Sequence, residues 1–289
     1  LPRLAGRHDL SFMLLASRQA PTVFLVLLLA GLCWAILAWL VIDMCHPIAM
    51  MTMPMSPAWS TSNFIAVFLM WAIMMAAMML PSALPMIIIH RKMSSTSTNG
   101  VTTAVFTATY LIIWSVFSIF AVTTQFFAHG LGVLNPSDLT LSTLFSAIVL
   151  IAAGGFQFTK LKDTCLKVCQ SPAGFFMTRW EGGSIGALKM GLSHGLFCLG
   201  CCWALMLLLF VGGVMNLAWV LLLTLGVLAE KTIPAGKALS NLIGIALIIF
   251  GAFLFYRYFW STPMMPMSDM AMDCMKMGNM DMKNMDMNK

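Results

Sequence analysis

Seven stretches of the chain consist almost entirely of apolar residues and are long enough to cross a lipid bilayer. They cover residues 22–42, 63–89, 101–122, 139–158, 185–210, 214–229 and 240–258. The hydrocarbon layer is roughly 30 Å thick and a helix rises about 1.5 Å per residue. The pattern therefore predicts an all-α fold, a polytopic membrane bundle of about seven transmembrane helices. Gly212 and Gly213 separate the fifth span from the sixth and predict a tight helical hairpin.

The same pattern divides the chain into three parts. Residues 1–21 form an N-terminal segment, residues 22–259 the membrane domain, and residues 260–289 a Met-rich tail. The first span is longer than the apolar core of a signal peptide and lacks a small-residue cleavage pattern, which favours a retained anchor. The tail shows neither helical nor strand periodicity, so we expect it to be disordered without a ligand.

Composition supports a membrane protein and excludes two other classes. Apolar residues make up 60% of the chain and charged residues 9%, and the mean hydropathy is +0.91. Soluble domains contain about 25% charged residues, so the lipid bilayer must cover much of this surface. The net charge of +6 is spread too thinly for a nucleic-acid-binding surface.

Basic residues alternate between loops and predict an orientation. They precede span one and then lie after spans two, four and six, whereas the other three loops between spans contain none. The positive-inside rule therefore predicts a cytoplasmic N-terminus and, with seven spans, an external C-terminus in a bacterial inner membrane. The residues that carry this argument are Arg3, Arg7, Arg18, Arg91, Lys92, Lys160, Lys162, Lys167, Arg179, Lys231 and Lys237.

Sulfur is unusually abundant, with 28 Met and 8 Cys, and the tail is its richest segment. From Met265 onward the tail contains five tandem five-residue units that each open Met-X-Met. Thioethers are soft, uncharged ligands that suit Cu(I) and need no deprotonation, which predicts a copper-binding tail. The alternative is a drifting low-complexity sequence. The candidate ligands are Met265, Met267, Met270, Met272, Met275, Met277, Met280, Met282, Met285 and Met287.

A second candidate cluster lies in the loop after span one, on the predicted outer side. It contains Cys45, His46, Met51 and Met53, and soft ligands of these types again suit copper. The alternative is an interfacial loop whose apolar side chains enter the headgroup region near Trp59. A disulfide between Cys45 and Cys274 would compete with a ligand role for either.

Span two supplies Met70, Met74 and Met78 at helical spacing. Because Met fills gaps in helix packing, a packed face is the alternative to a ligand stripe. Pro81 and Pro85 should kink the helix and free backbone carbonyls for other partners.

Span five places Met190, His194, Cys198, Cys201 and Cys202 on one face. We expect this face to meet the Met stripe of span two near the bilayer midplane and to bind copper there. Gly191 and Gly195 would permit the close approach of another helix. The alternative is that the thiols pack as small apolar groups and His194 hydrogen-bonds a neighbouring helix.

Cys165 and Cys169 lie in the basic loop after span four, spaced as CxxxC. The cytoplasm keeps thiols reduced, so a metal-binding pair and a structural role are equally compatible with this spacing.

The stretches MWAIMMAAMMLPSALPM, GGFQFTKLKDTCLKVCQSP and GLSHGLFCLGCCWALMLLLFVGGVMNLAWV resemble an uncharacterised bacterial family of predicted metal-binding integral membrane proteins, domain of unknown function 2182. The resemblance covers roughly residues 63–258 and leaves out the Met-rich tail. It implies the membrane fold and an association with metal, without implying a reaction.

Three hypotheses of function follow. The first is a copper(I)-handling membrane protein that binds, delivers or transports the ion, with copper as its cofactor and no catalytic residues. The second is a subunit or assembly factor of a membrane-bound copper enzyme, such as a copper monooxygenase, or a partner of a copper-delivery protein. The third is a thiol redox protein. The absence of a Walker motif and of a buried carboxylate relay argues against a pump and favours a non-enzymatic role.

Overall fold

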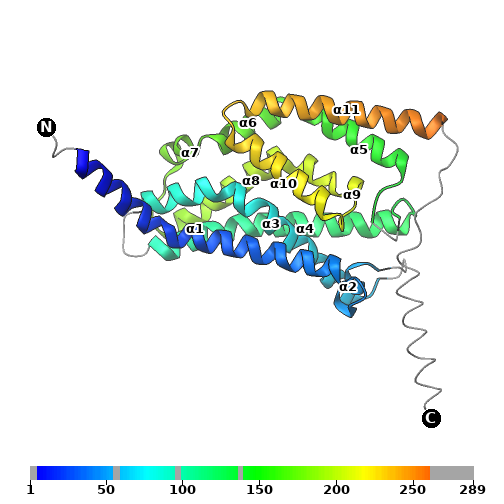
Figure 1. Cartoon of the computed structure of the whole chain (residues 1–289), viewed down its shortest axis with the longest axis horizontal. Coiled ribbons are helices and arrows are strands. Elements are labelled where there is room, and N and C mark those ends of the chain that lie inside the picture. The colour runs from blue at the N-terminus through cyan, green and yellow to red at the C-terminus, as the bar shows by residue number, and fades with distance from the viewer. Residues whose placement is uncertain (1–4, 55–58, 95–98, 136–138, 261–289) are drawn as a thin grey trace, which may run out of the picture.

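The computed structural model describes residues 5–54, 59–94, 99–135 and 139–260, and its helices run lengthwise in an elongated bundle (Figure 1). Within these residues the structure contains no strand beyond one isolated bridge between Leu134 and Leu141. The all-α prediction is confirmed. The helices are α1 (Ala5–Ile42), α2 (Pro47–Thr52), α3 (Thr61–Met93), α4 (Asn99–Gly130), α5 (Thr143–Phe156), α6 (Lys160–Gln170), α7 (Pro172–Arg179), α8 (Gly183–Leu207), α9 (Leu209–Gly212), α10 (Leu217–Thr232) and α11 (Gly236–Trp260).

Five segments are long and apolar enough to cross a membrane alone: Gln19–Ile42, Thr61–Met93, Gly100–Gly130, Gly183–Gly212 and Gly236–Trp260. A sixth span results if α5 and α6 are counted together, although the chain bends by 66° between them. The protein is therefore a multi-pass membrane protein with five or six such spans by length and composition, fewer than the predicted seven. The predicted span over residues 214–229 corresponds to α10, which has only 16 residues.

Helices α1 and α11 expose much of their apolar surface. Only 28% of the most hydrophobic window of α1 and 17% of that of α11 are buried inside the protein. Leu25 and Leu32 on α1, and Leu242 and Ile249 on α11, are all more than half exposed. A soluble protein would not leave such faces uncovered, so lipid is the environment that suits them.

Glycines set the closest helix contacts. A Cβ at Gly191 would lie 2.6 Å from the Phe106 carbonyl oxygen, and one at Gly195 would lie 2.8 Å from a side-chain carbon of Ile113. Helix α8 therefore packs tightly on α4, as the small-residue spacing predicted for some neighbouring helix. Gly154 and Gly244 permit a similar approach between α5 and α11.

The hairpin between α9 and α10 forms at the predicted glycine pair. Gly213 adopts φ 86°, a left-handed conformation that glycine reaches without a steric penalty. The Asn216 side chain then caps α10 by accepting a hydrogen bond from the Trp219 backbone. This turn reverses the chain, so α10 runs back beside α8.

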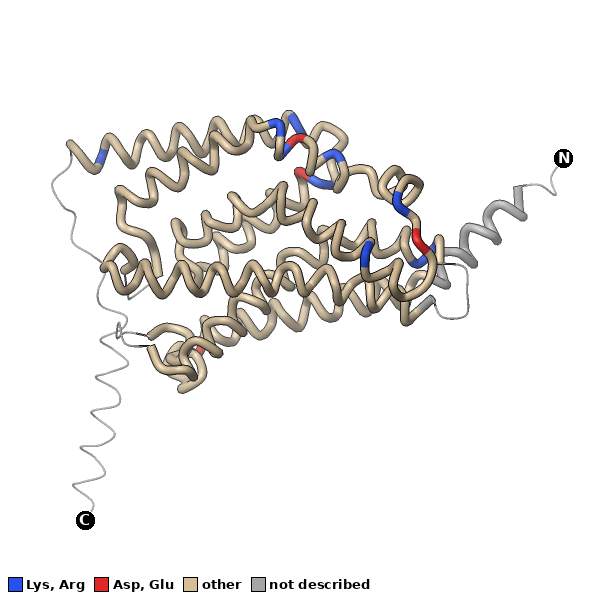
Figure 2. The backbone as a smooth tube through the Cα atoms, turned by 180° about the vertical axis from the view of Figure 1, so that it is seen from behind, with Lys and Arg blue, Asp and Glu red and all other residues tan. Residues whose placement is uncertain are grey.

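Lys and Arg residues of the described chain lie toward one end of the bundle, with an exception near the end of α11 (Figure 2). This arrangement agrees with the alternation of basic loops. Two of the residues in that argument differ from expectation, because Lys162 is 1% exposed and Lys231 is 7% exposed. Both enter the protein interior because α6 and the end of α10 fold against neighbouring helices.

Candidate metal centre

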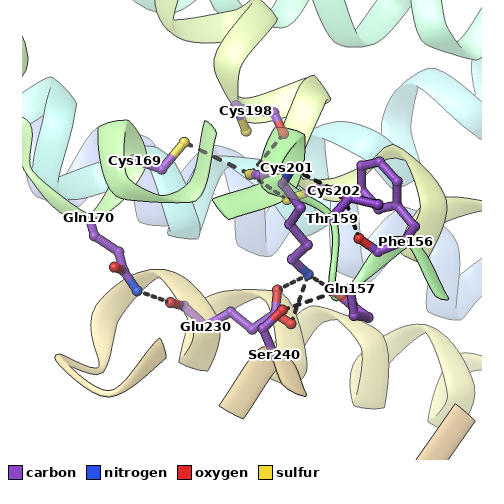
Figure 3. Close-up of polar contacts among 11 residues, drawn as sticks. Phe156, Gln157, Thr159, Cys169, Gln170, Cys198, Cys201, Cys202, Glu230 and Ser240 are labelled. Atoms are coloured by element: carbon purple, nitrogen blue, oxygen red, sulfur yellow. Dashed lines mark hydrogen bonds and ion pairs between the residues drawn. The ribbon is translucent and has the colours of Figure 1, made fainter. Parts of the chain in front are cut away.

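Four thiols from two helices meet in the interior of the bundle. Cys198, Cys201 and Cys202 lie on α8, and Cys169 lies on α6, which packs against α8 after the bend (Figure 3). The Cys201 sulfur lies 3.2 Å from the Cys202 sulfur and 3.9 Å from the Cys169 sulfur. All four side chains are buried and are free thiols. Neighbouring soft donors of this kind are the chemistry that copper(I) prefers.

Cys198 is the most highly connected of these thiols. The Lys231 ammonium on α10 donates to its sulfur at 3.0 Å and to the Ser82 hydroxyl on α3 at 3.0 Å. The Tyr110 hydroxyl on α4 lies 3.2 Å from the same sulfur and donates to the Met79 carbonyl at 3.2 Å. Cys198 therefore lies where α3, α4, α8 and α10 converge.

His194 occupies the turn of α8 before Cys198, and neither of its ring nitrogens has a hydrogen-bond partner among the residues that the structure describes. It is 3% exposed and stacks on Tyr110, with ring centroids 5.2 Å apart. The alternative expected for His194, a hydrogen bond to a neighbouring helix, is not formed with any of the described helices. A buried imidazole without partners carries a desolvation penalty, which ligation of a metal through one nitrogen would offset. Met190, one turn earlier, is also buried.

The Met stripe of α3 also faces inward. Met70, Met74 and Met78 are each 2% exposed or less. However, α4 packs against both α3 and α8, whereas α3 and α8 have little direct contact. Helix α4 occupies the position next to the α8 glycines. The shared copper site of the Met stripe and the thiol face stays a prediction. Helix α3 reaches Cys198 through Ser82 and the Met79 carbonyl instead.

The loop after the first span contains the short helix α2. The His46 side chain caps this helix by accepting a hydrogen bond from the Ile48 backbone at 3.3 Å, and its ring packs on Trp39. Met51 is 44% exposed and Met53 is half-buried. Cys45 is disulfide-bonded, which removes its thiol from the set of available ligands.

The ten tail methionines named as candidate ligands, and Cys274, lie outside the described residues, so copper binding by the tail stays a prediction.

The structure reveals polar residues that the sequence argument assigned to loops. Lys162 on α6 and Glu230 on α10 form an ion pair at 2.8 Å, with each side chain 1% exposed. Gln157 also accepts from Lys162, and Ser240 donates to Gln157 (Figure 3). Glu230 is thus a buried carboxylate that the sequence analysis did not single out, and its partner is a lysine. Its position after an apolar run in α10 was the available signal.

Among the residues that the structure describes, no group of three or more His, Cys, Asp and Glu side chains is placed to hold a metal ion. Pairs of neighbouring thiols, such as Cys201 with Cys202 and Cys201 with Cys169, are the sulfur contacts that the structure forms. Cu(I) accepts a low coordination number, whereas Zn(II) in structural sites takes four ligands.

Comparison with known proteins supports this chemistry. No curated protein and no solved structure matches the chain. Residues 68–254, well over half of the chain, match the PpoB2 family, which is described as a copper chaperone. The matched region contains α8, α10 and most of α3, and therefore the thiols and Lys231. The protein belongs to the PpoB2 family of copper chaperones and handles copper in a membrane.

Proposed function

We propose that this protein is a Cu(I) chaperone of the bacterial inner membrane that holds the ion at its interior thiols. The observation that carries the proposal is the convergence of Cys169, Cys198, Cys201 and Cys202 beside the unpartnered ring of His194. Thiolates bind Cu(I) more strongly than thioethers do in a low-dielectric interior, because they add charge attraction to a soft donor. We therefore assign Cys198 and a neighbouring thiol as the principal ligands.

The other sulfur-rich segments supply weaker sites in this proposal. Cu(I) is collected on the external side by the loop after the first span, through His46, Met51 and Met53, and by the ten candidate methionines of the tail. Met190, His194 and Cys198 follow one another at one-turn intervals on α8. The buried Met190 and His194 then provide donors of intermediate affinity beside Cys198. Thioether, imidazole and thiolate form a series of increasing affinity for the ion.

The chaperone assignment makes a partner protein necessary, because a chaperone releases its ion to a recipient. We propose a membrane-bound copper enzyme as that recipient, which includes the role of an assembly factor. The thiol redox hypothesis has less support, since the family is one of copper chaperones. The uncharacterised metal-binding family that the sequence resembles is compatible with this assignment.

The test is copper retention by the full-length protein in mild detergent after anaerobic loading with Cu(I). Cys198→Ser and Cys201→Ser should each release most of the interior copper, and the wild-type ion should give no Cu(II) electron paramagnetic resonance signal. Cys33→Ser is the matched control, because Cys33 is also a buried free thiol but lies on α1. Equal retention by all three variants would contradict the proposal.

A further inference from the structure

Lys231 is an unusual neighbour for a metal-binding thiol, since its ammonium repels any incoming cation. We propose that Lys231 is a specificity-determining residue that matches the thiol cluster to a monovalent ion. This inference rests on the proposed copper site at Cys198. It concerns the charge of the site, whereas the proposed function concerns the identity of the ligands.

The described interior of the protein contains few charged residues. Among the described side chains, Lys162, Glu230 and Lys231 are the Lys, Arg, Asp and Glu residues that are buried. Lys162 and Glu230 neutralise each other at 2.8 Å. Lys231 forms no ion pair with a carboxylate in the part of the chain that the structure describes, and its nearest anionic candidate is the Cys198 sulfur at 3.0 Å.

The Lys231 ammonium needs a counter-charge to be stable in the interior. An isolated ammonium in a low-dielectric interior is strongly unfavourable, and a counter-charge within hydrogen-bond distance removes most of the penalty. The Ser82 hydroxyl at 3.0 Å holds the ammonium beside Cys198 without adding charge. In this proposal the Cys198 sulfur, 3.0 Å away, supplies the charge that balances the ammonium before an ion binds.

The net charge of the Cys198 site after metal binding depends on the charge of the ion. Cu(I) held by Cys198 and one further thiolate, with the ammonium beside them, gives a neutral assembly. The proton of the second thiol leaves to solvent when the ion binds. Zn(II) on the same two thiolates would leave one uncompensated positive charge in the interior.

A third thiolate would restore neutrality for Zn(II), but geometry opposes it. No three of the described Cys, His, Asp and Glu side chains are placed around one ion position. Charge and geometry therefore act together, and both favour a monovalent ion with few ligands. Without the ammonium, the two-thiolate Cu(I) site would carry a net negative charge, while the Zn(II) site would become neutral.

The experiment measures binding of Cu(I), Ag(I) and Zn(II) to the full-length protein in detergent by competition dialysis. The quantity of interest is the part of the binding that Cys198→Ser removes, because the outer loop and tail also contain ligands. The variants are Lys231→Met, which removes the charge at similar volume, and Lys231→Arg, which keeps it. Lys189→Met on α8 is the control, since its side chain is 59% exposed.

We expect the wild-type protein, Lys231→Arg and Lys189→Met to bind Cu(I) and Ag(I) at the Cys198 site and to exclude Zn(II). Lys231→Met should lower the ratio of Cu(I) to Zn(II) affinity by at least about tenfold. An unchanged ratio in a folded Lys231→Met protein would overturn the inference and leave the copper site intact.

The wild type provides a test that does not depend on the folding of a variant. If Zn(II) binds at the Cys198 site of the wild-type protein as tightly as Cu(I), the inference is wrong. If Cys198→Ser removes no copper at all, the proposed function fails instead, so the two failures are distinguishable.

Discussion

The Tyr110 hydroxyl on α4 lies 3.2 Å from the Cys198 sulfur on α8, and it also donates to the Met79 carbonyl on α3. The Tyr110 hydroxyl thus links Cys198, the principal candidate ligand, to α3, a helix that does not pack directly on α8. The same residue stacks on His194. Tyr110 is therefore a positioning residue for two candidate ligands at once.

Tyr110→Phe should weaken copper retention without unfolding the protein. Phenylalanine preserves the ring that stacks on His194 and removes only the hydroxyl. The loss of one hydrogen bond of about 1 kcal/mol corresponds to roughly a fivefold weaker affinity for Cu(I). Tyr256→Phe on the exposed face of α11 is the control. An equal effect of the two substitutions would assign the loss to something other than the site.

Removing one partner of the buried Lys162–Glu230 pair should destabilise the protein more than replacing both partners by apolar residues. Glu230→Gln leaves the Lys162 ammonium without a counter-charge and should lower the free energy of unfolding by about 3–5 kcal/mol. Lys162→Met combined with Glu230→Leu should recover a large part of this loss. Denaturation in mixed micelles measures both. The exposed pair Lys189–Glu181 is the comparison, and Glu181→Gln should have little effect.

The close approach of α8 to α4 should depend on Gly191. In Gly191→Ala the new methyl group would meet the Phe106 carbonyl at 2.6 Å, so a backbone must move. Such overpacking lowers stability by about 1–3 kcal/mol and should also displace His194 and Cys198, with loss of copper. Gly31→Ala is the matched control, because nothing lies within 4 Å of the added carbon. A stable, copper-retaining Gly191→Ala protein would contradict this packing argument.

The Met-rich tail should bind Cu(I) through its thioethers. A synthetic peptide of residues 263–289 should bind Cu(I) and reject Zn(II), and replacing its eleven Met by Leu should abolish the binding. Spectroscopic competition with a Cu(I) chelator measures both peptides. Binding that survives the Leu series would assign the ion to Cys274 and the acidic residues.

The basic residues predict how the protein is oriented in the membrane. The basic end of the bundle should face the cytoplasm, since every basic loop between spans lies on that side. A reporter fused after Lys289 should be active outside the cytoplasm, and one fused before Leu1 should be active inside. A cytoplasmic C-terminus would place the Met-rich tail on the side opposite to the collecting role proposed for it.

The sequence by itself determined the membrane helices and the contents of each face. Long apolar runs become helices in lipid because every backbone hydrogen bond must be made within the segment. The spacing of Met190, His194 and Cys198 along α8 needs only helical periodicity, so their common inward face was predictable. The same holds for the turn at Gly213 and for the small-residue groove of Gly191 and Gly195.

The partners of that face were decided by the tertiary structure. Lys231 lies 33 positions from Cys198 and 149 positions from Ser82, and Lys162 lies 68 positions from Glu230. No local period relates residues so far apart, and the alternation of basic loops placed both lysines outside the spans. They are buried because α6 and α10 pack against other helices. In the interior each ammonium loses its hydration, and Lys162 gains the Glu230 carboxylate while Lys231 gains the Cys198 sulfur. The same packing places α4, and not α3, in the groove of α8, since only one helix fits beside the two glycines.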